Sequence, residues 1–162
     1  MGEDMSDALD KSLLEALLDS WDRNNGELAV KAMEGSPTVA ELFTHIHYVR
    51  LVLVLEDAPE FARELPEKEW AGERDPGRIV QMLNESAKAV RDAVKSRVEA
   101  ARDMDLHYDH PILLLQHMIW HEGDHHGQIK LALKLAGRAI SDREAGPVTW
   151  WVWMRKKSGL AT

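Results

Sequence analysis

The sequence has 162 residues, a formal net charge of −8 and no cysteine. A chain of this length can bury a core as one domain without disulfides, and the lack of cysteine excludes thiolate metal sites and thiol nucleophiles. An acidic chain without a basic stripe argues against nucleic-acid binding, and no apolar run is long enough to cross a bilayer or resembles a signal peptide. We therefore expect a single cytoplasmic domain over residues 1–162, with no nucleic-acid or membrane partner.

The first two predicted helices are separated by loop signals. Apolar residues at three- and four-residue spacing predict an amphipathic helix over about residues 7–21. A second helix start follows, with Ser36 as N-cap, Pro37 at the first helical position and Glu41 placed to close a capping box on Thr38. This second helix should run from about Pro37 into the fifties.

A proline-rich connection over residues 57–77 precedes the third predicted helix and has room for one short helical turn. The pair Asp75-Pro76 repeats the cap-plus-proline signal. Apolar residues at helical spacing then continue towards an end near Met104.

The fourth predicted helix begins at the pair His110-Pro111 and ends at Gly137, a residue type common just after a helix. Long helical periods with no alternating stretch predict an all-α protein, which we interpret as an antiparallel up-and-down four-helix bundle.

The C-terminal segment, residues 141–162, has a different composition from the helices. It contains three tryptophans within four positions, Trp150, Trp151 and Trp153. Such side chains avoid water, so we expect this tail to pack across the bundle or onto a partner subunit in a homodimer, with packing within the chain favoured.

Histidines dominate the fourth helix. His117, His121 and His125 are spaced four apart and form one stripe, and a pair of this spacing offers two metal ligands from one helix face. The second helix adds His45 and His47, which project about 200° apart, so only one of them can face a given site. Each lies on a flank of a broad apolar arc, and periodicity does not choose between them.

The other histidines have simpler interpretations. We expect His117 to lie in the core or to support the ligands from behind, and His126, about 100° away from His125 on the helix, to be exposed or at an interface. His107 and His110 fall in a loop that we expect to be solvated.

Two motifs together carry a family resemblance. A histidine in the second helix after "VAELFT", followed much later by "HEGDHHGQI" at residues 121–129, resembles the DinB-like (DNA-damage-inducible B) superfamily. The resemblance implies an antiparallel four-helix bundle that binds a divalent metal through His45, His121 and His125. His47 is the departure, because it repeats the candidate ligand two residues later.

The resemblance also implies a class of function, since the superfamily includes transferases and isomerases that depend on thiols such as mycothiol and bacillithiol. Three imidazoles with an open position are typical of a catalytic metal site, and zinc or nickel is the favoured ion. We expect an enzyme that activates a low-molecular-weight thiol (S-transferase type) or water (hydrolase type), with a small-molecule substrate and no catalytic residue assigned. The alternative is a non-catalytic metal-binding or protein-interaction module.

Overall fold

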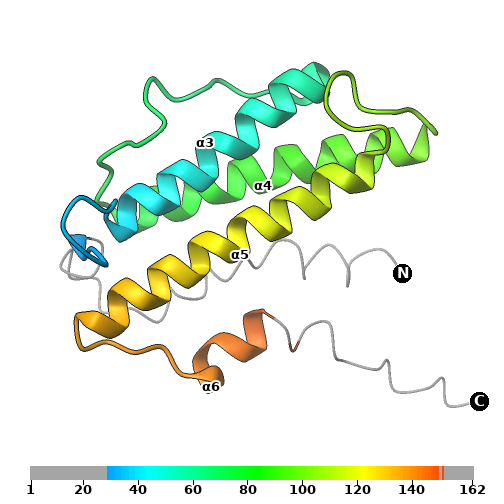
Figure 1. The fold of residues 1–162 in the computed structure, drawn as a ribbon. Helices are drawn as coiled ribbons and strands as arrows, with labels where there is room; N and C mark the ends of the chain where they lie inside the picture. Colours follow the sequence, from blue (N-terminus) through cyan, green and yellow to red (C-terminus); the bar gives the residue numbers. More distant parts are fainter. Residues whose placement is uncertain (1–28, 150, 152–162) are drawn as a thin grey trace, which may run out of the picture.

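Three long helices form the body of the computed structural model, which describes residues 29–149 and residue 151. They are α3 (Val39–Asp57), α4 (Pro76–Glu99) and α5 (Pro111–Leu135). Figure 1 shows α3 and α4 side by side, with α5 packed along them. The described part of the chain contains no β-strand, and none of its helices is both long enough and apolar enough to cross a membrane.

The start of α3 confirms the predicted capping box and corrects the predicted N-cap. Thr38, rather than Ser36, is the N-cap, and the helix begins at Val39, two residues after Pro37. The Thr38 hydroxyl accepts the Glu41 backbone N–H at 3.2 Å, while Glu41 Oε2 accepts the Thr38 backbone N–H at 2.7 Å. Because this reciprocal pair satisfies two backbone donors, it fixes where the helix starts.

The end of α4 falls earlier than predicted, at Glu99 rather than near Met104. Ala101 adopts the left-handed conformation with φ 47°, and the Arg102 backbone N–H donates to the Arg97 carbonyl at 2.9 Å. This is the turn that commonly ends helices, made here by an alanine, so no glycine marked it in the sequence.

The bounds of α5 agree with the prediction. His110 is the N-cap and Nδ1 of its ring accepts the backbone N–H of Ile112 at 3.1 Å, so His110 has a structural role in the loop. Gly137 has φ +86° just after the helix, where a glycine has little strain.

The direction of α4 differs from a simple up-and-down order. Arg50 on α3 hydrogen-bonds to the carbonyl of Leu83 and to Ser86 on α4, so the middle of one helix lies against the middle of the other. Figure 1 shows that both helices start at the same end and run parallel, whereas α5 returns antiparallel to both. The connection between α3 and α4 therefore has to travel back along the length of the bundle.

Two apolar clusters fill the space between the three helices. One joins the first halves of α3 and α4 to the last part of α5, and the other joins their second halves to the first part of α5. The buried members of the first cluster that lie on these helices are Val39, Ala40, Leu42, Phe43, Ile46, Ile79, Leu83, Ile129, Ala132 and Leu133. Burial of such side chains is the main stabilising contribution to a helical fold of this kind.

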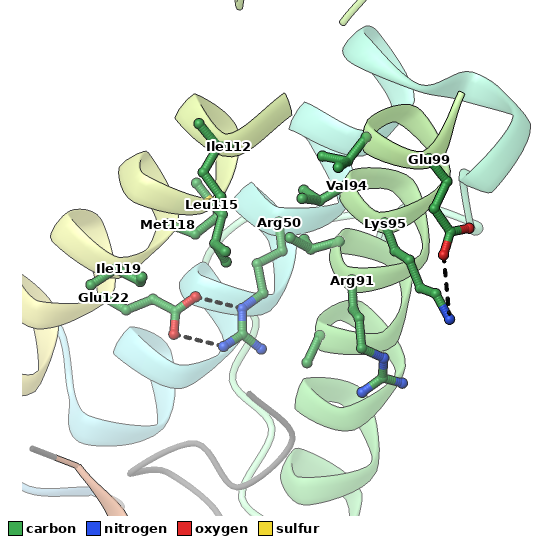
Figure 2. Close-up of a pocket in the computed structure, with 13 residues that line it drawn as sticks. Arg50, Arg91, Val94, Lys95, Glu99, Ile112, Leu115, Met118, Ile119 and Glu122 are labelled. Carbon is green, nitrogen blue, oxygen red and sulfur yellow. Dashed lines mark hydrogen bonds and ion pairs between the residues drawn. The ribbon is translucent and has the colours of Figure 1, made fainter. Parts of the chain in front are cut away.

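A buried ion pair crosses this core. Arg50 Nε donates to Glu122 Oε1 at 2.7 Å and Arg50 Nη2 donates to Oε2 at 2.6 Å, so the contact is bidentate (Figure 2). The two side chains are only 6% and 13% exposed. They border an apolar groove of about 360 Å³ between α4 and α5.

Short elements complete the described chain. A 3₁₀ turn, η2 (Pro59–Phe61), confirms the helical turn expected in the connection, and α6 (Asp142–Ala145) leads into η3 (Gly146–Val148). A Cβ atom at Gly146 would lie 2.6 Å from the Trp151 ring, so the ring packs against this glycine.

Two predicted features lie outside the described residues. The helix expected over about residues 7–21 is one, and most of the tryptophan-rich tail, including Trp150 and Trp153, is the other. The four-helix count and the docking of the tail therefore stay predictions.

The ion pair gives the first test. Arg50→Met should leave the Glu122 carboxylate buried without its partner and lower the free energy of unfolding by about 3–5 kcal/mol, measured by urea denaturation. The double variant Arg50→Met/Glu122→Met removes both charges and should lose much less than the two single variants together. A loss below about 1 kcal/mol for Arg50→Met would contradict a buried, paired Glu122.

Candidate metal centre

Three histidine rings from two helices converge on one point. Nε2 of His121 lies 3.2 Å from Nε2 of His45 and 3.1 Å from Nε2 of His125. One ligand atom from each of the three residues lies within 4.8 Å of the others. His45 comes from α3, and the other two stand one turn apart on α5, as their four-residue spacing predicted.

The arrangement fits a transition-metal ion. Nitrogen ligands about 2.0–2.1 Å from a tetrahedral zinc ion lie about 3.3 Å from one another, close to the two Nε2 separations above. Three imidazoles, with no thiolate available, are ligands that suit zinc, nickel, iron or copper.

Oxygen atoms behind two of the rings favour the tautomer that a metal requires. Glu69 Oε1 lies 2.9 Å from Nδ1 of His45, and Gln128 Oε1 is 3.4 Å from Nδ1 of His125. An oxygen acceptor at Nδ1 places the proton there and leaves the lone pair of Nε2 directed at the cluster. The amide of Gln128 is itself held by Asp124, because Nε2 of Gln128 donates to Oδ2 of Asp124 at 2.9 Å.

Burial favours the neutral form of two imidazoles in the cluster, those of His121 and His45. It lowers the pKa of His121 to about 4, with further lowering from the charges that His125 and His45 would carry. Burial also lowers the pKa of His45, again with help from His125, while Glu69 opposes the shift. Since only neutral imidazole binds a metal, burial keeps His45 and His121 in the state that metal binding requires at neutral pH.

The structure separates His45 from His47, which periodicity had left open. His47 is 4% exposed and lies on the α4 side of α3, where it borders a cavity of about 640 Å³ together with Arg78, Met82 and Glu85. Burial lowers its pKa as well. Because His47 points away from α5, His45 is the α3 histidine of the cluster.

The prediction that His117 is buried in the core or behind the ligands is wrong. His117 is exposed, and its Nδ1 lies 2.6 Å from the Tyr108 hydroxyl. Its ring centroid is 6.3 Å from that of His121. His117 therefore sits one turn beyond the cluster, on its solvent side.

His107 is exposed in a loop, as predicted, whereas His126 differs from the prediction of an exposed side chain. His107 Nδ1 lies 2.8 Å from the buried Asp57 carboxylate, which also accepts the backbone N–H groups of Leu106 and His107, so this loop is tied to the end of α3. His126 is half-buried rather than exposed, and burial lowers its pKa to about 4.

Two residues beside the cluster were missed in the sequence. Trp70 stacks on the His45 ring, with centroids 4.0 Å apart and planes 1° from parallel, and Glu69 contacts the same ring at its edge. Both come from the connection before α4, where no periodicity predicts which side chain faces a helix. The i to i+3 spacing of His125 and Gln128, in contrast, was a usable signal for their contact.

Fold and site together define an all-helical protein with a candidate three-histidine metal centre. The sequence matches the family described as the DinB superfamily over residues 9–129. Because this match covers most of the chain, the protein belongs to the DinB superfamily, as the two sequence motifs indicated. A search of curated proteins gave no match, and neither did a search of solved structures.

Metal content tests the ligand assignment. Protein purified without a metal-affinity tag and then loaded with zinc should hold about one equivalent per chain by elemental analysis, falling to near zero in the alanine variants of His45, His121 and His125. His47→Ala is the matched control and should keep the ion, with circular dichroism confirming that each variant is folded. Retention by His45→Ala together with loss by His47→Ala would reverse the assignment.

Acid should destabilise the metal-free protein. His121 and His126 titrate at about 4 in the folded protein and near 6.5 when unfolded. As the pH falls from 6.5 to 4, the unfolded chain binds protons that the folded chain does not, so the free energy of unfolding should fall through this window. Urea denaturation at several pH values measures the slope, and His126→Gln, which removes one titrating group, should reduce it. A free energy that stays flat or rises on acidification contradicts these pKa values.

Proposed function

We propose that this protein is a metal-dependent enzyme in which His45, His121 and His125 hold a divalent ion that activates a low-molecular-weight thiol or water. The convergence of the three Nε2 atoms is the observation that supports this proposal. Membership of the DinB superfamily supports it independently. Zinc and nickel are the ions we favour, and a small-molecule thiol is the substrate class we expect.

A divalent ion on three imidazoles supplies a Lewis acid with an open position, which lowers the pKa of a bound water towards ~7 and stabilises a bound thiolate. The protein's contribution is to favour the neutral form of His45 and His121 by burial and to point the Nε2 atoms of all three histidines at one place. Because the chain has no cysteine, a thiolate in this site has to come from outside.

The surroundings of the ligands indicate where a substrate approaches. His45 and His125 are buried, at 9% and 8% exposure, whereas His121 is partly exposed. His117, which is exposed, lies one turn from His121 on this side, and its Nδ1 is 2.6 Å from the hydroxyl of the half-buried Tyr108. These two groups are placed to accept or donate a proton beside a substrate held at the metal.

Cobalt substitution distinguishes a thiol substrate from water. Adding a low-molecular-weight thiol to the Co²⁺-loaded protein should produce a sulfur-to-cobalt charge-transfer band in the near ultraviolet, and the loaded enzyme should consume the thiol when an alkylating electrophile is added. His47→Ala should behave as the native protein does, whereas His121→Ala should show neither signal.

The other outcomes of this experiment are equally informative. If no band appears but a panel of amides and esters is hydrolysed, water is the activated nucleophile. If the metal binds and neither reaction occurs, the enzymatic proposal fails and a non-catalytic metal-binding module replaces it.

A further inference from the structure

The connection between α3 and α4 contributes part of the metal centre. Glu69 Oε1 lies 2.9 Å from Nδ1 of His45, and Trp70 covers one face of the same ring at a centroid separation of 4.0 Å. His45 thus has one contact on its face and another at Nδ1, the ring nitrogen that does not face the cluster. Neither contact comes from a helix.

This part of the connection, residues 69–74, is tied to α3 at two points, and we call it the strap. The hydroxyl of Thr44, the residue before His45, donates to the Ala71 carbonyl at 3.0 Å. Arg74 Nη1 donates to the Thr38 hydroxyl at 2.9 Å, at the N-cap of α3. Both threonines are buried. The two anchor points follow Trp70 in the chain, and both attach the strap to the helix that carries His45.

These contacts restrict the two degrees of freedom that matter for a ligand histidine. Stacking against Trp70 with planes 1° from parallel limits rotation of the imidazole plane. The Glu69 carboxylate favours a proton on Nδ1, which leaves Nε2 as the ligand atom and increases its basicity. Contacts of this kind determine how precisely a ligand side chain keeps the position and orientation that metal binding requires.

We propose that the strap is a positioning element of the metal centre, in which Glu69 sets the tautomer of His45 and Trp70 sets the orientation of its ring. This inference rests on the proposed function, because it assumes that His45 is a ligand. Within the described part of the chain, polar and ring contacts from outside α3 and α5 are found at His45, through Glu69 and Trp70. The α3–α4 connection therefore sets the metal affinity of a site whose ligands all lie on helices.

Metal affinity measures this role directly. In competition with a chromophoric chelator, Glu69→Ala should weaken Zn²⁺ or Co²⁺ binding by about 10- to 100-fold, the usual effect of removing a carboxylate behind a ligand histidine. Glu69→Gln keeps an acceptor oxygen but loses the charge, so its loss should be smaller. Trp70→Ala should also weaken binding and shift the visible spectrum of bound Co²⁺, whereas Trp70→Phe, which can still stack, should stay close to the native protein.

Glu67→Gln is the matched control, since Glu67 is an exposed carboxylate of the same connection that borders the His47 cavity. It should bind metal as the native protein does. Affinity unchanged in Glu69→Ala, or lowered equally in Glu69→Ala and Glu67→Gln, would overturn the positioning role.

A readout without metal separates this inference from the proposed function. In the metal-free protein, ¹⁵N–¹H correlation spectra of the imidazole rings should show His45 with its proton on Nδ1, and Glu69→Ala should shift it towards a mixture of tautomers. The His45 signals are those missing from His45→Ala. If the native protein binds no metal, the proposed function fails while the tautomer still tests the strap; if metal binds but neither affinity nor tautomer responds to Glu69, the strap inference alone fails.

Discussion

The ion pair between Arg50 and Glu122 sets how α5 lies against α3, and the histidine cluster depends on that register. The two helices are antiparallel, so a step along α3 from His45 to Arg50 corresponds to a step back along α5 from His125 to Glu122. The carboxylate is bound through both oxygens and buried, so a slip or rotation of α5 would leave it unpaired in the core. Because Glu122 directly follows His121, the same contact fixes the direction in which the His121 side chain leaves α5.

The core thus stabilises buried polar groups in two opposite ways, as a charged ion pair and as neutral imidazoles. Arg50 and Glu122 stay charged because each pairs with a group of opposite sign. Burial raises the pKa of Glu122, but the charge and hydrogen bonds of Arg50 outweigh this effect and leave the pKa of Glu122 below its usual value. The imidazoles of the cluster meet like groups, and burial lowers the pKa of His121 to about 4. The Nε2 atoms of the cluster lie 3.1 and 3.2 Å apart, a spacing that fits three nitrogen ligands around one cation.

The features that could be predicted from the sequence depend on residues close together in the chain. The capping box at Thr38, the proline at position 76 and the glycine at 137 act over a few residues, and the four-residue spacing of His121 and His125 makes them neighbours on any helix. Which α3 histidine joins them depends on how the three helices pack. Because His45 and His47 are both buried, the pattern of polar and apolar residues along α3 could not distinguish them. The burial of Glu122, like the support from Glu69, depends on contacts between residues far apart in the sequence.

Topology explains why a loop reaches the histidine cluster. Parallel α3 and α4 require a connection that returns along α3, a helix about 28 Å long. Residues 58–75 span about 60 Å when extended, so the connection has length to spare and can follow the surface of α3 on its way back. That path passes the turn of α3 that carries Thr44 and His45, where the Thr44 hydroxyl holds it. An antiparallel order would allow a short turn at the far end of α3 and leave His45 without Glu69 and Trp70. The parallel direction of α3 and α4 therefore brings a carboxylate and an aromatic ring to His45, which the helices alone would leave uncovered.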